Sequence, residues 1–207
     1  LDQPVLCQNV SAHLKQIPDL DRSLSRLASG RGGPRDLYSL AQGLLGARRI
    51  ATSCLSSEHI ELNAEMARLC ALAEAPAALG DMILPALGED LPLLTREGGF
   101  IRSGYDSQLD NLRQMRDESR RLIAALQAKY AEETGVSSLK IKHNNVLGYH
   151  IDVRANHGEK LLSDEAFIHR QTTAQAVRFT TTELSDLEKQ LSTAAERAVA
   201  LELELFG

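Results

Sequence analysis

The sequence predicts a mainly α protein: a helical bundle with a long antiparallel helical arm that carries a small four-stranded antiparallel β-sheet at its tip. Two observations lead to this fold class. Two segments with heptad-like apolar spacing flank residues 139–179, and between them the apolar period changes from about 3.6 to 2. Helices with such seams bury their apolar stripes against each other, so the segment between them is held at the far end of the arm.

The two seams define the arm helices. In the first, Arg116 and Ser119 are weak positions among Leu109, Leu112, Ile123, Leu126 and Tyr130. The second seam is unbroken, with alternating steps of three and four residues: Leu184, Leu187, Leu191, Ala194, Ala198, Leu201 and Leu205. Gly135 is expected to end the first arm helix, because glycine readily takes the left-handed conformation that follows a helix C-terminus.

The first half of the chain predicts helices separated by turn residues. Asp19 marks the start of a helix because it precedes leucines that share one face. Further helices are expected over 34–54 and from about 58 to 74, and glycines and prolines predict a broken or short helix in 76–92. We therefore expect a helical core in 1–105, a long helix plus sheet in 106–182, and a return helix in 183–207.

Alternation predicts the four strands. Apolar and polar residues alternate in 139–142 and 149–154, on both sides of a turn at Asn144 and Asn145, and a weaker pair covers 167–171 and 177–181. His150, Asp152 and Arg154 are expected on the solvent face. Because the first arm helix leads outward, we expect the first strand to continue outward. Both hairpin bends, near Asn144 and near residue 173, should then lie together at the tip.

Composition limits the function classes. The 207-residue chain has a formal net charge of −5, which argues against a protein that coats nucleic acid or membranes through its overall charge. Residues 136–181 carry 6 Lys or Arg and 4 Asp or Glu, so they have a formal charge of +2 and the remainder has −7. The insert therefore has a charge opposite in sign to the rest of the chain.

Cysteine usage and hydropathy predict a cytoplasmic protein. Cys7, Cys54 and Cys70 are odd in number and form no CxxC pair, which favours reduced thiols over disulfides or a zinc ribbon. We expect no apolar run that approaches the roughly 18 residues of a membrane span, and no signal-peptide pattern opens the chain. Because it begins at Leu1 without methionine, we expect an excised piece of a longer protein.

Polar side chains at the expected tip suit phosphate oxygens. Amides and hydroxyls donate hydrogen bonds and cations add charge without reading base edges, and the small charge excess predicts weak, salt-sensitive contact. An ordinary solvated pair of hairpins is an equal alternative, because Asn and Thr are good turn residues. The candidate residues are Lys142, Asn144, Asn145, Arg170, Gln171, Thr172, Gln175 and Arg178, with His143 just behind the bend.

No pattern predicts catalysis. The chain lacks the GxxxxGK[ST], GxGxxG and GxSxG motifs, so we expect no nucleotide cofactor and no catalytic residue. Four of the six histidines fall in the insert, but without the local spacing of metal ligands: His143, His150, His157 and His169. We expect no metal site, and a histidine-based metal enzyme is the least favoured hypothesis.

Several segments, in the same order along nearly the whole chain, resemble the bacterial MutS DNA mismatch-repair proteins. Before the insert these segments are 19–22 (DLDR), 26–27 (RL), 34–37 (PRDL), 98–101 (GGFI), 103–106 (SGYD) and 109–110 (LD). In the insert they are 139–141 (LKI), Asn144, 148–151 (GYHI), 170–172 (RQT), 178–179 (RF) and 183–184 (EL). Each match is weak alone, and together they are specific.

The resemblance implies the middle of a MutS protein: the core, or lever, interrupted by the clamp. Family proteins form dimers that encircle DNA, and they bind ATP and Mg²⁺ in a domain that this sequence lacks. The resemblance implies that the clamp contacts the DNA backbone without sequence preference at Asn144 and at the bend from Arg170 to Arg178. Ala174 departs from relatives that can carry a basic residue there, which implies a weaker hold on DNA.

We therefore expect a non-catalytic fragment of a cytoplasmic mismatch-repair ATPase, with double-stranded DNA and the second subunit of a homodimer as partners. The lever helices would transmit conformational change between DNA-binding and ATPase domains. The alternative is a coiled-coil interaction module whose β tip docks a protein partner. That alternative predicts an exposed apolar patch at the tip, where Val146, Leu147 and Ala174 are the few candidates.

Overall fold

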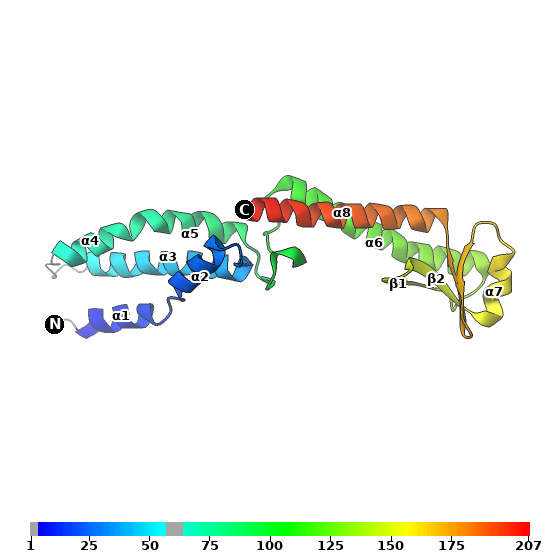
Figure 1. Ribbon diagram of the computed structural model, residues 1–207, viewed down its shortest axis with the longest axis horizontal. Coiled ribbons are helices and arrows are strands. Elements are labelled where there is room, and N and C mark those ends of the chain that lie inside the picture. The colour runs from blue at the N-terminus through cyan, green and yellow to red at the C-terminus, as the bar shows by residue number, and fades with distance from the viewer. Residues whose placement is uncertain (1–3, 57–63) are drawn as a thin grey trace. The chain divides into compact units, whose positions relative to one another are not determined.

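The computed structural model describes residues 4–56 and 64–207, which fold as two compact units (Figure 1). The first unit contains residues 1–106 and 202–207, and the second contains residues 107–201. Most of the described chain is helical, and a four-stranded antiparallel sheet lies in the second unit. The predicted fold class is confirmed.

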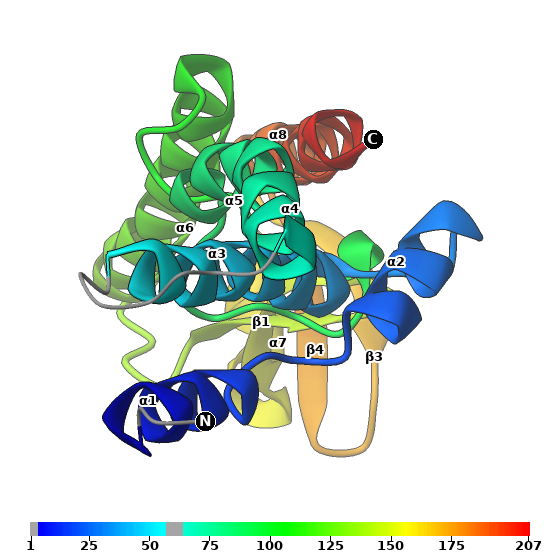
Figure 2. The ribbon, with the colours of Figure 1, turned by 90° about the vertical axis from the view of Figure 1, so that its left-hand side faces the viewer.

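The described part of the first unit is mainly helical. Its helices are α1 (Pro4–Leu14), α2 (Leu20–Ala28), α3 (Pro34–Leu55), α4 (Ala64–Leu72) and α5 (Glu74–Ala86), followed by the 3₁₀ turn η1 (Thr95–Glu97). Helices α4 and α5 pack on α3 (Figure 1 and Figure 2). The helix predicted from about 58 to 74 begins at Ala64 within the described residues, and 57–63 lie outside them.

Local caps explain two of the helix starts. Asp19 accepts a hydrogen bond from the Arg22 amide at 3.0 Å and caps α2. At the start of α3, Asp36 accepts from the Gly33 amide at 2.9 Å and from Arg26 Nε at 3.1 Å. The same carboxylate thus caps α3 and ties it to α2, which gives residues 34–37 a structural role.

Helix α5 continues through Gly80, where the sequence predicted a broken or short helix. A Cβ at Gly80 would lie 2.9 Å from the Ala41 carbonyl oxygen and 2.7 Å from Leu45, so the absent side chain lets α5 approach α3 closely. By length and composition alone, α4 and α5 together (Ala64–Ala86) could cross a membrane, with a mean hydropathy of 1.4. The stretch includes Asp81, which forms an ion pair with Arg48 of α3.

The last turn of α8 (Thr182–Phe206) belongs to the first unit. Phe100 is fully buried and packs edge-on against Phe206, with ring centroids 5.6 Å apart. Its amide donates to the buried carboxylate of Glu202 at 3.1 Å. The predicted seam is therefore wrong at its end, because Glu202 is buried there and Leu205 is 37% exposed.

In the second unit, α6 (Ser107–Thr134) and the part of α8 up to Leu201 run antiparallel, with the sheet at the end of α6 (Figure 1). The core between them and the sheet contains Ile123, Leu126, Tyr130, Val136, Leu139, Ile151, Val153, Leu161, Phe167, Val177, Phe179 and Leu184. Leu187 and Leu191 pack against this core, which confirms this part of both seams.

Polar contacts join the facing ends of α6 and α8. Lys129 Nζ donates to Glu183 Oε2 at 2.9 Å, and the Tyr130 hydroxyl lies 2.8 Å from Thr181 Oγ1. The hydrogen bond from Lys129 lowers the pKa of Glu183, and the same bond raises the pKa of Lys129. Burial raises the pKa of Tyr130.

The sheet has the strand order β1-β2-β4-β3, and each pair of neighbours is antiparallel. The strands are β1 (Lys140–Asn144), β2 (Gly148–Arg154), β3 (Ile168–Thr172) and β4 (Ala176–Thr180). The β3–β4 register shifts between His169 and Gln171, so Arg170 is the extra residue of a β-bulge on an edge strand.

The predicted direction of β1 is wrong. Gly135, with φ +63°, ends α6, and a turn from the Val136 carbonyl to the Leu139 amide (3.0 Å) reverses the chain. The Ile141 amide then donates to Gln127 Oε1 at 2.9 Å, so β1 runs back alongside α6. A cap glycine favours a helix end but does not set the direction that follows, and the structure shows a reversal.

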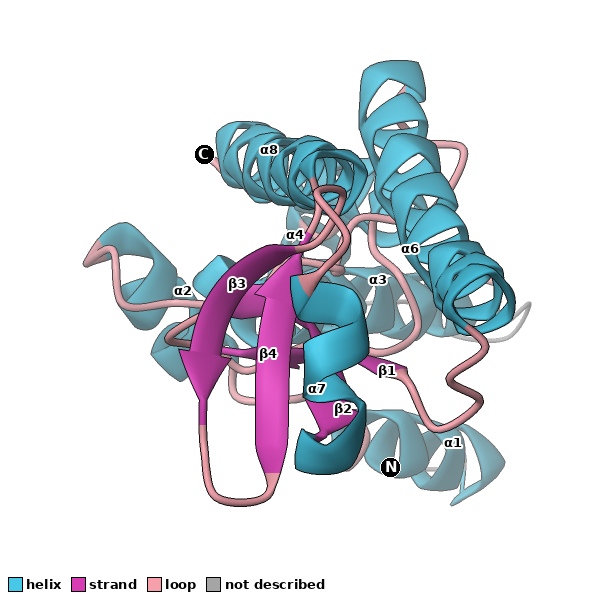
Figure 3. Ribbon diagram, turned by 90° about the vertical axis from the view of Figure 1, so that its right-hand side faces the viewer, coloured by secondary structure: helices cyan, strands magenta, loops and turns pink. Residues whose placement is uncertain are grey.

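As a consequence, the two hairpin bends lie at opposite ends of the sheet. In the β2–β4 ladder, Ile151 pairs with Phe179 and Arg154 pairs with Ala176. The β1–β2 bend precedes the start of β2, whereas the β3–β4 bend lies beside its end. Figure 3 shows the β3–β4 bend projecting beyond the strands. The prediction that both bends lie together is therefore wrong.

A short helix, α7 (Ala155–Leu162), joins β2 to β3, where the sequence analysis placed His157 in a loop. α7 packs on β2 and β4 (Figure 3), and a Cβ at Gly158 would lie 2.6 Å from Val177. The solvent face predicted for β2 also needs correction: His150 is buried, with Nδ1 3.0 Å from the Gly148 carbonyl oxygen. Asp152 is partly buried on the same face, and Arg154 is exposed.

Candidate nucleic-acid interface

Three cations from three strands gather around an open hollow on the polar face of the sheet. Lys142 comes from β1, Arg154 from β2 and Arg178 from β4. The hollow has a volume of about 640 Å³ and is lined by Lys142, Asp152, Arg154, Ala155, Asn156, Thr173, Gln175, Ala176 and Arg178. It lies at the β3–β4 end of the sheet.

Strand register places these side chains together. Asp152 is paired with Arg178 across the β2–β4 ladder and with Lys140 across the β1–β2 ladder. Lys142 lies two residues from Lys140 on the same face, because successive side chains in a strand alternate. The opposite face carries Ile151, Val153 and Phe179 into the core.

Asp152 links two of the cations. Lys142 Nζ donates to Asp152 Oδ1 at 2.9 Å, and Arg178 Nε donates to Oδ2 at 3.4 Å. Arg178 also donates from Nη1 to Gln171 Oε1 at 2.6 Å. With three cations and one carboxylate, the lining has a formal charge of +2, which suits an anionic ligand.

The β3–β4 bend borders the hollow and is fixed by its own hydrogen bonds. Thr173 Oγ1 accepts from the Ala176 amide at 3.1 Å and donates to its carbonyl at 3.0 Å. The Gln175 carbonyl accepts from the Ala155 amide at 3.1 Å, which ties the bend to the start of α7. The backbone at Gln175 is therefore held in place at the rim of the hollow.

The predicted residues of β3 lie on the exposed edge strand. All five residues of β3 are exposed. Gln171 reaches Arg178, and Thr172 Oγ1 lies 2.8 Å from His169 Nε2 across the bulge. A bulge changes the direction of a side chain relative to a regular strand, and here that side chain is Arg170.

Asn144 and Asn145 lie at the other bend, away from this group. Asn144 Oδ1 accepts from the Val146 amide at 2.9 Å and from the Leu147 amide at 2.8 Å, so this oxygen closes the turn. Asn145 is exposed. The structure thus brings Lys142, Gln171, Gln175 and Arg178 together but does not bring the two asparagines to them.

Sequence reasoning missed Arg154, Asp152 and Asn156 as site residues. The alternation in 149–154 had placed Asp152 and Arg154 on the solvent face, and this signal could have added both of them. Asn156 has no such signal, because its position depends on α7. The four histidines of the insert occupy different settings, and among the described residues no three His, Cys, Asp or Glu side chains gather as a metal site.

Family models match both parts of the chain. Residues 1–147 match MutS domain III, and residues 104–197 match MutS family domain IV. The chain belongs to the MutS family. The two domains imply a fragment of a mismatch-repair protein, and domains III and IV of MutS are non-catalytic. The domain IV match includes the whole sheet and the hollow, and the overlap of the two matches covers α6 and β1.

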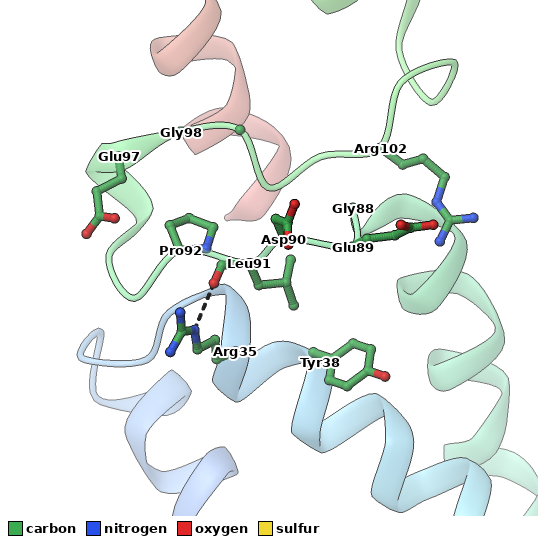
Figure 4. Close-up of a pocket in the computed structure, with 11 residues that line it drawn as sticks. Arg35, Tyr38, Gly88, Glu89, Asp90, Leu91, Pro92, Glu97, Gly98 and Arg102 are labelled. Atoms are coloured by element: carbon green, nitrogen blue, oxygen red, sulfur yellow. Dashed lines mark hydrogen bonds between the residues drawn. The ribbon is translucent and has the colours of Figure 1, made fainter.

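A second hollow lies in the domain III part of this MutS chain (Figure 4). It has a volume of about 980 Å³, and its lining includes Arg35, Arg102, Glu89, Asp90 and Glu97. Arg35 donates to the Leu91 carbonyl at 2.8 Å (Figure 4), and Arg102 donates to the Leu87 carbonyl at 3.0 Å. Two arginines and three carboxylates give a formal charge of −1, so this hollow suits phosphate less well.

Proposed function

We propose that the sheet contacts the phosphate backbone of double-stranded DNA without sequence preference. The observation that carries the proposal is the convergence of Lys142, Arg154 and Arg178 on one hollow that has a single carboxylate. Lys and Arg side chains neutralise phosphates and release counterions, and this term is independent of sequence. The hollow at the β3–β4 end is the main contact surface of this proposal.

The neighbouring polar groups support contact with the backbone instead of the bases. Gln175 and Asn156 line the hollow, and Gln171, Thr172 and Arg170 lie on the adjacent exposed strand. Amide and hydroxyl groups donate to phosphate oxygens and fix orientation without carrying sequence information. Asn144 and Asn145 form a separate proposed contact at the other bend.

The helices support a lever role. α8 is one continuous helix whose residues up to Leu201 belong to the unit with the sheet and whose remaining residues belong to the helical unit. Glu202 and Phe206 are fixed there through Phe100. A helix is stiff over such lengths, so we propose that α6 and α8 transmit conformational change between a DNA-contacting sheet and the rest of a full-length protein.

The wider setting belongs to the same proposal. The full-length protein would act in the bacterial cytoplasm as a homodimer, with ATP and Mg²⁺ bound in a domain outside this chain. Because the 207 residues have a net charge of −5, we propose that this chain alone binds DNA weakly at physiological salt. Nanomolar binding by a monomer at that salt concentration would contradict this part.

Duplex binding at low salt tests the proposal. We expect Arg170→Ala combined with Arg178→Ala to flatten the slope of log K against log salt by about 2, and Arg154→Ala to flatten it by about 1. Arg68→Ala is the matched control, because Arg68 is exposed on α4 and pairs with Glu65. An unchanged affinity and slope in every sheet variant would overturn the proposal.

The structure does not favour a protein-docking tip. Val146 is 90% exposed at the β1–β2 bend. Ile168, another exposed apolar residue, lies on β3 at the opposite edge of the sheet, so the two do not form one patch. Scattered exposed apolar side chains are ordinary on protein surfaces. This alternative would be revived if the chain bound a protein partner and Val146→Ser abolished that binding.

A further inference from the structure

We propose that Asp152 is a built-in competitor for the phosphate site: its carboxylate occupies Lys142 and Arg178 until a DNA phosphate replaces it. The inference rests on the proposed function and adds how that contact surface is regulated. Asp152 is the single carboxylate among the residues that line the hollow. Each of its two oxygens is hydrogen-bonded to a different cation.

The geometry makes Asp152 resemble a bound phosphate. A carboxylate and a phosphodiester each present two oxygens that share one negative charge, and Lys and Arg bind either group through charge-assisted hydrogen bonds. Arg178 is engaged on two sides, because Nε donates to Asp152 and Nη1 donates to Gln171. Two of the three cations in the hollow are therefore already satisfied from within the sheet.

Arg154 is in a different state. It lines the same hollow and is exposed, and its guanidinium has no hydrogen-bond or ion-pair partner among the described residues. A phosphate can therefore meet Arg154 first, without displacing any partner. Transfer of Lys142 and Arg178 from Asp152 to the phosphate then completes the contact, and Asp152 opposes this second step through its charge.

Removing the charge of Asp152 has two opposing effects. It releases the two cations and raises the formal charge of the lining from +2 to +3, which strengthens phosphate binding. It also loosens the side chains that Asp152 holds. Because the side chains of Lys142 and Arg178 are 56% and 28% exposed, holding them in place contributes little. The change in charge therefore dominates, and the Asp152→Asn variant should bind DNA more tightly than the native chain.

The experiment measures binding of the 207-residue chain to a fluorescent duplex of arbitrary sequence over a series of salt concentrations. We expect Asp152→Asn to bind about threefold to tenfold more tightly at low salt, with a slope steeper by about 1. The matched control is Asp186→Asn, which removes the same charge from α8, where Asp186 pairs with Lys189. The control should change affinity by less than about twofold.

A second pair of variants tests the competition itself. In the native background Lys142→Ala removes a cation that Asp152 already engages, so we expect only a small loss of affinity. In the Asp152→Asn background the same Lys142→Ala substitution should lose more, because Lys142 is then available to phosphate. Asp152→Ser serves as a second neutral variant, and circular dichroism verifies the fold of each protein.

The outcomes separate this inference from the proposed function. If Asp152→Asn and Asp152→Ser bind equally or less tightly, while Arg154→Ala and Arg178→Ala weaken binding, Asp152 is a scaffold and the inference is overturned alone. An equal gain in DNA affinity for Asp186→Asn would also overturn the inference, because the change in net charge alone would then explain the effect. If the arginine variants and the Asp152 variants all match the native chain, both proposals fail.

Discussion

The two hairpin bends of the sheet both contain polar residues but have different surroundings. The β1–β2 bend contains Asn144 and Asn145, and the β3–β4 bend contains Thr173 and Gln175. At the first bend the polar side chain of Asn144 closes its own turn, whereas the second bend borders a hollow with three cations. Polar turn residues alone therefore do not identify a binding surface. The strands beside a bend decide which charges it meets.

Both bends belong to a sheet that packs on one core, so a core variant should destabilise the sheet as a whole. Phe179 is fully buried, with its ring 6.3 Å from Phe167 and 5.9 Å from His169 between centroids. Phe179→Ala should lower the free energy of unfolding by about 3–5 kcal/mol through lost burial and a cavity. Urea denaturation measures this effect, with Val146→Ala as a control within about 0.5 kcal/mol. A small loss for Phe179→Ala would mean that the sheet does not depend on this core.

The β1–β2 bend should be sensitive at Gly148. Gly148 has φ +67°, and a Cβ there would clash with the Glu188 carboxylate, which accepts from the Tyr149 amide at 2.9 Å. Gly148→Ala should destabilise the chain by about 2 kcal/mol or more, because backbone strain adds to the loss of that hydrogen bond. Gly30→Ala is the matched control, with φ +68° and open space around it. Equal losses in the two variants would show that Glu188 moves aside freely.

The two neighbouring asparagines should contribute differently to the free energy of unfolding. Asn144→Ala removes the acceptor for two backbone amides and should cost about 1 kcal/mol in unfolding free energy. Asn145→Ala should cost almost nothing, because Asn145 is an exposed surface residue. Duplex binding by the same proteins tests their proposed DNA contact. A flatter salt slope for Asn145→Ala would show that both bends reach DNA, which would end the contrast between them.

The smallest effect concerns the helix ends behind the sheet. The hydrogen bond from Lys129 lowers the pKa of Glu183 below its ordinary value of 4.5. The pair therefore contributes stability above about pH 4.5, and this contribution is lost as pH falls through the lowered pKa. Because both side chains are about half exposed and water screens the pair, we expect this contribution to be small. Glu183→Gln should remove this part of the pH dependence in denaturation measured from pH 6 to pH 3, and an unchanged pH profile would contradict it.

The fold class could be predicted because each element has its own period. The seam residues Ile123, Leu126 and Tyr130 are buried as expected, and alternation located all four strands. The direction of β1 could not be predicted, since Gly135 permits either continuation and the choice depends on the contact between Ile141 and Gln127. α7 was missed because Gly158 is a poor helix former. The glycine is needed there for close contact with Val177, which is a tertiary contact that local sequence does not show.

For the candidate site, residue types were easier to predict than their grouping. Lys142, Gln175 and Arg178 do lie around one hollow, but Asn144 does not, because grouping depends on strand order. Asp152 is a second residue whose face could be predicted but whose neighbours could not. Its alternation indicated a solvent-facing carboxylate, whereas only the ladder between β2 and β4 places it against Arg178. Local periodicity indicates which face a side chain occupies, and the register determines its neighbours.

The bulge in β3 has a consequence for how this region can vary. On either side of Arg170 the ladder is regular, with His169 opposite Phe179 and Gln171 opposite Arg178. Arg170 itself has no partner in this ladder, so the pairing of β3 with β4 does not depend on its side chain. Strand pairing therefore does not require an arginine at this position. An arginine maintained there across descendants would have to be kept for what its guanidinium touches.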